Sequence, residues 1–310
     1  ECLVGSEMCI RDSPEIKEAL AKGLELCNVV KPDLLLATDP DCDRVGIAVP
    51  SDNGYELFTG NEVGAMLLEY ICSERTKMGT MPADPVAVKT IVTTDIAAKI
   101  AKEYGVKLIE VLTGFKFIGE QIGFLEDKGQ EDRYIFGFEE SYGYLAGSYV
   151  RDKDAVVASM LICEMAAFYR TKGISLIQAR ENMYKKYGVY VHSQSSFVCE
   201  GVTGMERMKE IMSDLRTNTP KTIGGLTVTR FEDYLASTSV DTATGAKTML
   251  TLPKSDVLTF KLTDGASVII RPSGTEPKIK AYYTTTGTTK AEAAALEKTI
   301  SDDFAKILGF

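Results

Sequence analysis

The sequence has 310 residues, of which 45% are hydrophobic and 25% are charged, a composition typical of a globular protein with more than one domain. Thirty-five basic and 44 acidic residues give a formal net charge of −9, which argues against a nucleic-acid partner and requires any anionic ligand to find its basic residues locally. The longest apolar stretch, 155–168, is interrupted by Glu164 and is too short to span a bilayer, so no membrane partner is expected.

The cysteines and the histidine exclude several kinds of site. The seven cysteines are scattered, odd in number and form no Cys-x-x-Cys, which favours a reducing cytoplasm and argues against a structural zinc site. His192 is the only histidine, so histidine-based metal sites and Ser-His-Asp triads are essentially excluded. It lies in an alternating strand pattern and is interpreted as structural.

The chain begins with a stretch that fits nothing after it. Residues 1–13 resemble a translated adapter or cloning remnant and carry no expectation about the fold. Ser13 and Pro14 then form a helix-start pattern, and a helix is predicted from there to about Cys27. The native sequence is expected to begin near Pro14, in a protein that starts well upstream.

The rest of the chain changes character twice. Strands alternate with helices from the Gly- and Pro-containing segment at 78–85 to residue 187, which indicates an α/β domain with a largely parallel sheet. A strand at 189–199 is predicted to leave that domain, and a mixture of strands, Gly-rich turns and two helices follows. The expected division is a non-native leader at 1–13, the end of one α/β domain at 14–80, a second α/β domain at 81–200 and an α+β domain at 201–310.

Three carboxylates occupy alternate positions in the loop after the first predicted strand. Asp39, Asp41 and Asp43 have short side chains, so a loop that curls around a point could aim all three at one cation. Like charges this close repel each other, and a hard divalent ion such as Mg²⁺ prefers carboxylate oxygens. An acidic turn facing solvent is the alternative, but the flanking apolar strands and Arg44 favour a metal loop.

Two further stretches precede helices. Lys116 follows Thr113 and Gly114 at a strand-to-helix junction, where backbone N–H groups favour anions, although a Thr-Gly entry is more often only a cap. Arg151 and Lys153 stand among aspartates before a long helix. That pattern is typical of a solvent-exposed helix start. The alternative is that Arg151 or Lys153 contacts a phosphate group.

The stretch Gly137-Phe-Glu-Glu-Ser-Tyr-Gly-Tyr144 passes from an apolar strand directly into two carboxylates and a hydroxyl. Glu139 and Ser141, held on a rigid loop, could hydrogen-bond the vicinal hydroxyls of a sugar. A charged turn without a ligand is the alternative, at about even weight from this stretch alone.

A fourth stretch runs from Arg271 to Lys280. A strand ends in Arg271, the loop Ser273-Gly274-Thr275 follows, and the next strand carries two lysines. A guanidinium, two hydroxyls and free loop amides suit a phosphate dianion, whereas a plain hairpin would not need the surrounding Arg and Lys.

These motifs, in this order, resemble those of the α-D-phosphohexomutases, the phosphoglucomutase/phosphomannomutase family, and most of all its larger phosphoglucomutase-type members. The resemblance covers the chain from Pro14 to its end and implies mixed-sheet α/β domains that bind metal and sugar, followed by a phosphate-binding α+β domain. It implies Mg²⁺ as cofactor and a hexose 1,6-bisphosphate as activator and intermediate.

The resemblance also assigns roles to residues. It implies that Asp39, Asp41 and Asp43 bind Mg²⁺, that Arg44 lies beside the transferred phosphoryl group, and that Lys116, the second catalytic residue, lines the same cleft. The remaining residues would bind the phosphosugar: Glu139 and Ser141 its hydroxyls, Arg271, Ser273, Gly274 and Thr275 its non-reacting phosphate, with Arg151 and Lys153 lining the same cleft.

One departure from the family is large. The family's phosphoserine lies in a Ser-His-Asn-Pro-like loop, and this sequence contains no Ser-His pair. The chain is therefore expected to lack the nucleophile and to show no conversion of glucose 1-phosphate by itself. Oligomeric state and the choice between glucose, mannose and another hexose stay open.

Two alternatives remain. Asp41-Cys-Asp43-Arg-Val45 matches the Asp-x-Asp-x-Val loop of haloacid-dehalogenase-type phosphatases, a short pattern that leaves the other motifs unexplained. The other alternative is a catalytically incompetent fragment that binds Mg²⁺ and a sugar phosphate.

Overall fold

A computed structural model describes residues 13–199, 203–274 and 276–310. The chain divides into two compact units, with the division between Tyr187 and Gly188. None of the helices within the described ranges is long and apolar enough to cross a membrane. The predicted boundaries after residues 80 and 200 stay a prediction, and the predicted leader lies, apart from Ser13, outside the described residues.

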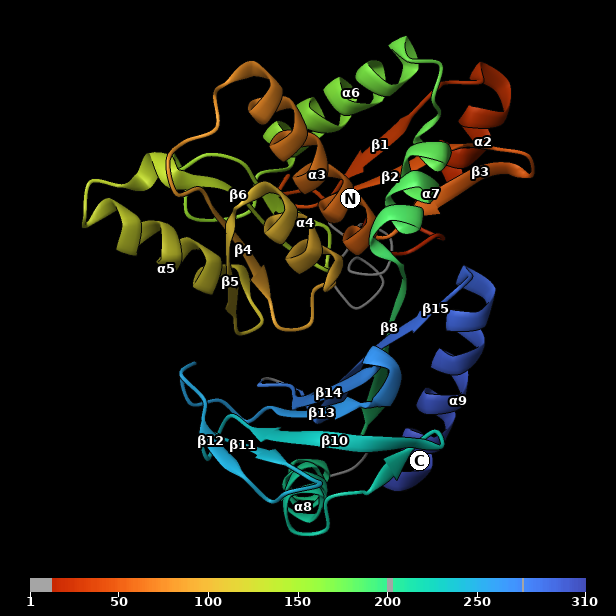
Figure 1. The fold of residues 1–310 in the computed structure, drawn as a ribbon. Coiled ribbons are helices and arrows are strands. Elements are labelled where there is room, and N and C mark those ends of the chain that lie inside the picture. The colour runs from red at the N-terminus through yellow and green to blue at the C-terminus, as the bar shows by residue number, and fades with distance from the viewer. Residues whose placement is uncertain (1–12, 200–202, 275) are drawn as a thin grey trace. The chain divides into compact units, whose positions relative to one another are not determined.

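The first unit contains two sheets and the helices that pack on them (Figure 1). Its strands are β1 (Leu35–Thr38), β2 (Val45–Ser51), β3 (Gly54–Phe58), β4 (Val86–Thr90), β5 (Lys107–Val111), β6 (Tyr134–Glu139) and β7 (Gly143–Leu145). Its α-helices are α2 (Ala21–Val30), α3 (Gly60–Met78), α4 (Ile96–Tyr104), α5 (Phe115–Glu126), α6 (Ala155–Thr171) and α7 (Leu176–Tyr187).

The smaller sheet is antiparallel and has the order β1-β2-β3. Thr38 at the end of β1 pairs with Val45 at the start of β2, so residues 39–44 form the tight loop between these strands. The larger sheet has the order β5-β4-β6-β7; β4 pairs in parallel with β5 and β6, whereas β7 is antiparallel to β6. The largely parallel sheet is therefore confirmed, and the β6–β7 hairpin is an addition that the sequence did not predict.

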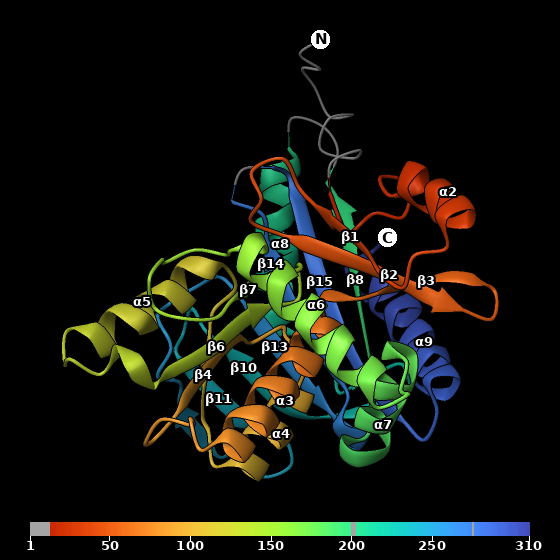
Figure 2. The same cartoon turned by 90° about the horizontal axis from the view of Figure 1, so that it is seen from above.

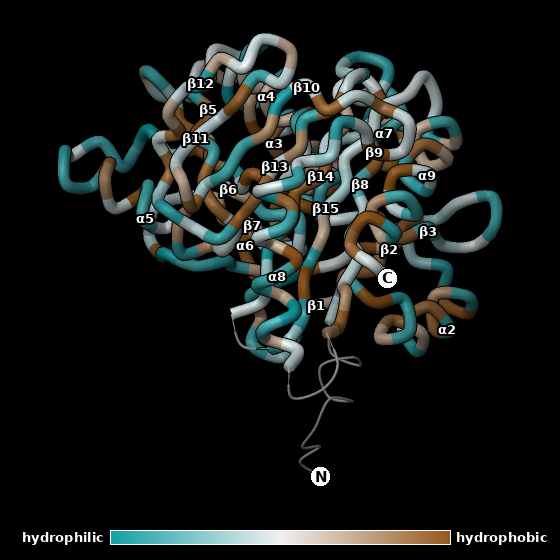
Figure 3. The backbone as a smooth tube through the Cα atoms, turned by 90° about the horizontal axis from the view of Figure 1, so that it is seen from below, coloured by the Kyte–Doolittle hydropathy of each residue, from teal (hydrophilic) through white to brown (hydrophobic). Residues whose placement is uncertain are grey.

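Helices cover both faces of the larger sheet, with α5 on one side and α3 and α4 on the other (Figure 2). The face under α5 is apolar: Val86 and Val88 of β4 pack with Ile118 and Ile122 of α5. In Figure 3 the apolar colour follows β2, while the far end of α5 is hydrophilic. This arrangement places the end of β6 and the starts of α3 and α5 at one edge of the sheet.

The first helix is shorter and later than predicted. The sequence predicts a helix from Ser13–Pro14 to Cys27, but residues 14–20 form turns and α2 begins at Ala21. The carbonyl oxygen of Pro14 lies so close to Gly46 that a Cβ there would be 2.7 Å from it. Packing of this segment on β2 thus overrides the local helix signal, because tertiary contacts outweigh propensity.

The second unit is an antiparallel sheet covered by two helices. Its helices are α8 (Gly204–Thr217) and α9 (Lys290–Leu308), and its strands are β8 (Val189–Val198), β9 (Thr222–Ile223), β10 (Leu226–Asp233), β11 (Thr238–Asp241), β12 (Lys247–Met249), β13 (Leu258–Leu262), β14 (Ser267–Pro272) and β15 (Lys278–Gly287). The strand order is β12-β11-β10-β13-β14-β15-β8, with β9 paired to β10. The α/β fold followed by a C-terminal α+β part is thus confirmed.

The strand at 189–199, which the sequence predicts to leave the preceding domain, belongs to the sheet of the second unit. β8 pairs along its whole length with β15, from Val189 opposite Gly287 to Val198 opposite Lys278. A strand's partner depends on distant residues, so its own alternating pattern could not reveal it.

The core of the second unit lies between the sheet and its helices. Met212 of α8 and Phe304 of α9 belong to the same buried cluster as Phe260 and Tyr283 of the sheet. Both helices therefore cover one face of the sheet, as Figure 1 also shows. Lys280 alternates along β15 with Ile279 and Ala281 of this core, so its side chain lies on the other face of the sheet.

Candidate functional site

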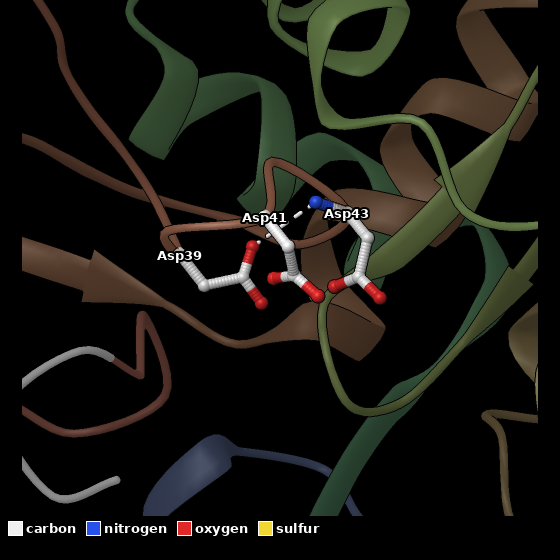
Figure 4. A group of neighbouring side chains, drawn as sticks. All are labelled: Asp39, Asp41 and Asp43. Atoms are coloured by element: carbon white, nitrogen blue, oxygen red, sulfur yellow. Dashed lines mark hydrogen bonds between the residues drawn. The ribbon is translucent and has the colours of Figure 1, made fainter. Parts of the chain in front are cut away.

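The loop between β1 and β2 gathers Asp39, Asp41 and Asp43. One oxygen from each carboxylate lies within 4.8 Å of the other two. Figure 4 shows the three side chains next to one another, pointing out of the loop in the same direction. Asp39 is buried, Asp43 is half-buried and Asp41 is exposed, so the group opens toward solvent. Three converging carboxylate oxygens are a donor set that suits a hard divalent cation.

Asp39 also holds the loop in shape. Its Oδ1 accepts hydrogen bonds from the backbone N–H groups of Asp43 (3.1 Å) and Arg44 (2.9 Å), and its Oδ2 accepts one from Arg44 Nε (2.7 Å). Burial alone would raise the pKa of Asp39, but the hydrogen bonds from Arg44 lower it below its usual value. Asp39 is therefore an anion whose oxygens are already aimed by the loop.

Two cations stand beside these carboxylates. Arg44 Nη1 donates to Glu15 at 3.0 Å, so its guanidinium is held between Asp39 and Glu15. Lys153 Nζ lies 2.9 Å from Asp43 Oδ2. Burial would lower the pKa of Lys153, but Asp43 and its neighbour Asp152 raise it above its usual value, so the ammonium stays charged. Two positively charged side chains, Arg44 and Lys153, therefore lie beside the three carboxylates.

The turn after β6 carries Glu139 and Ser141. Residues 140–142 link β6 to β7, and Glu139 pairs with Gly143 across the hairpin. The Glu139 carboxylate is buried, and the side chain of Ser141 interacts with it and lowers its pKa. A carboxylate and a hydroxyl therefore stand together in this turn.

Backbone contacts join this turn to the carboxylate loop. Val45 N–H donates to the carbonyl of Tyr142 at 3.2 Å, and Arg44 forms an isolated β-bridge with Gly143. On the other side, Ala155 N–H donates to the carbonyl of Cys42 at 3.0 Å. The structure thus brings Asp39, Asp41, Asp43, Arg44, Glu139, Ser141 and Lys153 together.

Burial is the main reason why Glu139 resists ionisation. Burial raises the pKa of Glu139 most, and the neighbouring carboxylate of Glu140 raises it further. Lys153 and Ser141 lower this pKa, and Asp152 raises it slightly. Together these effects raise the pKa of Glu139 to about 7. A carboxyl group with such a pKa exchanges a proton near neutral pH, which is a property common in catalytic and binding sites.

Because of Glu139, the free energy of unfolding is expected to decrease as the pH rises. Its pKa of about 7 lies above the usual 4.5, so the folded chain binds this proton more tightly than the unfolded chain does. The stabilising effect is complete below about pH 4.5 and is lost as the pH rises to about 7, by a total of about 3 kcal/mol. Urea unfolding between pH 4.5 and 8 measures it, and Glu139→Gln should remove this part of the pH dependence. An unchanged pH dependence in Glu139→Gln would contradict the assignment.

Lys116 lies in the first turn of α5, and the guanidinium of Arg151 lies at the other end of this helix, although the backbone of Arg151 packs on Gly119. Lys116 is exposed in the first turn, with its Nζ 4.9 Å from the centre of the Phe117 ring. Arg151 directs its guanidinium to the carboxylate of Glu126, at the last residue of the helix, and to the carbonyl of Ser148. Ten residues of helix separate Lys116 from Glu126, about 15 Å. The structure therefore brings Lys153 but not the Arg151 side chain to the carboxylate loop.

The loop between β14 and β15 carries the other predicted site residues. Arg271 lies directly opposite Lys280 across the two strands, and its Nε donates to Tyr282 Oη at 3.3 Å. Like charges directly opposite each other in a sheet are unfavourable, which is the arrangement expected where an anion binds.

The turn itself is closed by its own backbone. Ser273 N–H donates to the carbonyl of Lys278 at 2.8 Å, and Glu276 N–H donates to Ser273 Oγ at 3.4 Å. A Cβ at Gly274 would meet no atom within 4 Å, so the backbone there is accessible to a ligand. Thr275 lies outside the described residues.

Sequence reasoning missed several residues that shape the site. Glu15, which holds Arg44, carries no local signal, because the two residues meet only through the fold. Thr90 and Thr93 place their hydroxyls 3.2 Å and 3.4 Å from Glu140 in the turn after β6. They could have been found, since polar residues at the carboxyl end of a buried parallel strand meet the ends of its neighbours. Gly60, which contacts the turn after β6, stands in an ordinary helix start.

Comparison with known proteins matches both units. The model of the phosphoglucomutase/phosphomannomutase alpha/beta/alpha domain III matches residues 59–187, and that of the phosphoglucomutase/phosphomannomutase C-terminal domain matches residues 216–302. A phosphoglucomutase of Staphylococcus aureus (strain bovine RF122 / ET3-1) is 38% identical over 271 residues, which are 87% of this chain and 48% of that protein. The chain spans about half the length of the curated relatives it matches.

Solved structures give the same result for the fold. The exocytosis-sensitive phosphoprotein pp63/parafusin, a phosphoglucomutase from Paramecium, matches in its open form with a TM-score of 0.66 and 20% identity, over 93% of this chain and 48% of that one. A phosphoglucomutase/phosphomannomutase family protein from Burkholderia thailandensis matches with a TM-score of 0.59 and 15% identity, over 96% and 51%. The chain thus has the fold of phosphohexomutases, a class of isomerases. With the family models and the sequence relatives, it follows that the chain belongs to the phosphoglucomutase/phosphomannomutase family.

Proposed function

We propose that the chain carries the metal-, sugar- and phosphate-binding parts of a phospho-sugar mutase that interconverts hexose 1-phosphate and hexose 6-phosphate, with glucose as the favoured hexose. The main support is the convergence of Asp39, Asp41 and Asp43 beside Arg44 and Lys153 in a member of this family. A phosphoserine outside these 310 residues supplies the phosphoryl group, and the bisphosphate formed from it is the intermediate. A cytoplasmic location fits the scattered cysteines.

In this proposal Asp39, Asp41 and Asp43 hold Mg²⁺, which neutralises charge on the phosphoryl group during its transfer. Arg44, fixed by Asp39 and Glu15, contacts the same phosphoryl group. Lys153 supplies a further positive charge at the site. Phosphoryl transfer depends mainly on positioning and charge neutralisation, and these side chains offer both.

The substrate itself is bound from several loops. Glu139 and Ser141 accept and donate hydrogen bonds with the sugar hydroxyls. Arg271, Ser273, Gly274 and Thr275 clamp the phosphate that does not react. Lys116 at the start of α5 and Arg151 line the path of the substrate, although the side chain of Arg151 must leave Glu126 to reach it.

The haloacid-dehalogenase alternative has less support. The carboxylate loop joins the antiparallel strands β1 and β2, and both units match the mutase family over most of their length. An aspartyl-phosphate trapped at Asp41 would still favour the phosphatase.

Metal binding tests the proposal directly. The purified chain should bind one Mg²⁺ ion in titration calorimetry, and Asp41→Asn should weaken this binding at least tenfold, about 1.4 kcal/mol. Asp41 is exposed, so the variant should fold normally. Asp52→Asn, which changes an exposed aspartate in the β2–β3 turn, is the matched control and should bind like the wild type. Equal affinities for Asp41→Asn and Asp52→Asn would refute the metal site.

Turnover tests the origin of the phosphoryl group. The chain alone should not convert glucose 1-phosphate to glucose 6-phosphate, even with Mg²⁺ and glucose 1,6-bisphosphate present. Clear turnover by the purified chain would show that it carries its own nucleophile and would contradict the role of an outside phosphoserine.

A further inference from the structure

The hydroxyl groups of Thr90 and Thr93 contact the turn after β6. Thr90 Oγ1 and Thr93 Oγ1 lie 2.7 Å apart, at and just beyond the end of β4. Both reach the carboxylate of Glu140, with Thr90 Oγ1 at 3.2 Å and Thr93 Oγ1 at 3.4 Å from Glu140 Oε2. Both threonines are buried, at 1% and 3% exposure, so their hydroxyls need partners inside the protein.

A buried ammonium group fixes the segment that carries Thr93. Lys89 Nζ donates to the carbonyl of Thr93 (3.0 Å) and to Asp95 Oδ1 (3.0 Å), and it lies 2.8 Å from Glu110 Oε1. Burial would lower the pKa of Lys89, but Asp95 and Glu110 raise it, so this lysine stays charged although it is only 1% exposed. The position of the Thr93 hydroxyl is thus set by charged groups on β4, β5 and the start of α4.

The start of α3 supports the turn from another side. A Cβ at Gly60 would lie 2.2 Å from the carbonyl oxygen of Glu140 and 2.7 Å from the backbone nitrogen of Tyr142. The backbone of the turn therefore rests directly on the helix. Asn61 Oδ1 accepts the backbone N–H of Thr94 at 2.9 Å, which ties the same helix start to the segment after β4.

We propose that Glu140 is a positioning residue for the turn: its carboxylate, held by the hydroxyls of Thr90 and Thr93, fixes the direction in which the adjacent Glu139 and Ser141 face a ligand. The two hydroxyls have two hydrogens for three contacts, so one threonine donates to Glu140 while the other donates to its neighbour. A hydrogen bond to a carboxylate is stronger than one to a neutral acceptor, so this pair of threonines holds Glu140 in place. The role of Glu139 and Ser141 in binding sugar hydroxyls rests on the proposed function. The role of Glu140 in holding the turn in place is independent of it.

Thr93→Val is the informative variant, because valine keeps the shape of threonine and removes only the hydroxyl. We expect amide hydrogen exchange in β7, which follows the turn directly, to become at least tenfold faster in Thr93→Val and in Glu140→Ala. Thr93→Ser keeps a hydroxyl and should restore exchange to within about twofold of the wild type. Thr259→Val, which changes a buried threonine of the second unit, is the matched control and should leave β7 unchanged.

Ligand affinity provides the readout that a purely structural role would not change. In the presence of Mg²⁺, Thr93→Val and Glu140→Ala should bind glucose 1,6-bisphosphate about tenfold more weakly at a temperature where both are folded, and Thr93→Ser should recover most of the loss. Wild-type exchange rates in β7 of Thr93→Val would overturn the proposal. So would faster exchange with unchanged affinity, since the turn would then not position its ligand groups. If the wild type itself fails to bind the bisphosphate, the proposed function fails, and the exchange comparison still decides whether Glu140 fixes the turn.

Discussion

Replacing Arg180 with leucine is expected to lower the free energy of unfolding by about 3–5 kcal/mol, because it leaves a buried carboxylate without its cation. Arg180 is 3% exposed, and its Nη1 lies 2.6 Å from Glu56 Oε1 and 3.4 Å from Glu62 Oε1. Glu62 is itself only 6% exposed and also accepts the Tyr184 hydroxyl at 2.8 Å. Urea unfolding of the wild type and the variant at pH 7 measures the difference.

Arg170→Leu is the matched control. Arg170 pairs with Asp33, but both side chains are largely exposed, and such pairs contribute about 0–1 kcal/mol. The control should therefore be nearly as stable as the wild type. A loss in Arg180→Leu no larger than that in Arg170→Leu would show that solvent or a rearranged side chain takes over the role of Arg180 at Glu62.

Asp39→Ala is expected to lower the free energy of unfolding by about 2–4 kcal/mol, even with no metal in solution. The carboxylate of Asp39 accepts two backbone N–H groups and the Nε–H of Arg44, and its removal takes this acceptor from all three, while Arg44 keeps only its bond to Glu15. Asp41→Ala should change the stability by less than about 0.5 kcal/mol, because an exposed side chain is replaced.

The comparison separates two roles of neighbouring aspartates. Both variants should lose Mg²⁺ binding, but only Asp39→Ala should unfold more readily. Unfolding in urea with a chelator present measures stability, and calorimetry measures binding. Equal stability of the two variants would mean that the hydrogen bonds of Asp39 add nothing to the loop beyond what water supplies.

Long helices could be predicted from the sequence closely. The apolar spacing in the sequence predicts helices at about 204–217 and at 60–77. The structure has α8 with the first of these bounds, and α3 extends one residue beyond the second. The start of α3 has a capping box, in which Thr59 and Glu62 satisfy each other's backbone N–H groups, and Gly79 ends the helix in the left-handed conformation. Such signals are local, so a single sequence contains them.

Other elements depend on partners that the sequence does not reveal. β7 has only three residues and forms because β6 lies beside it. The first helix starts late because Pro14 packs on β2, and β8 joins β15 across a separation of about ninety residues. These outcomes follow from tertiary contacts, which a local pattern cannot encode.

The candidate site divides in the same way. The carboxylate loop and the turn with Glu139 could be recognised because each is a short run with distinctive chemistry. The sequence could not show that Lys153 reaches Asp43 while Arg151, two residues earlier, turns to Glu126. It also could not show the groups that hold the site in place, such as Glu15, Thr90 and Thr93, because they come from other elements.

The backbone hydrogen bonds between the carboxylate loop and the turn after β6 have a thermodynamic consequence. The bond from Val45 to Tyr142 and the bridge between Arg44 and Gly143 join the two loops directly, so a ligand that shifts one loop acts on the other through these contacts. If both ligands bind as proposed, whatever factor Mg²⁺ applies to the affinity for the sugar phosphate, the sugar phosphate must apply to the affinity for Mg²⁺. A change at Glu140 that alters this factor should therefore alter the metal's dissociation constant, measured with the sugar phosphate bound, by the same ratio.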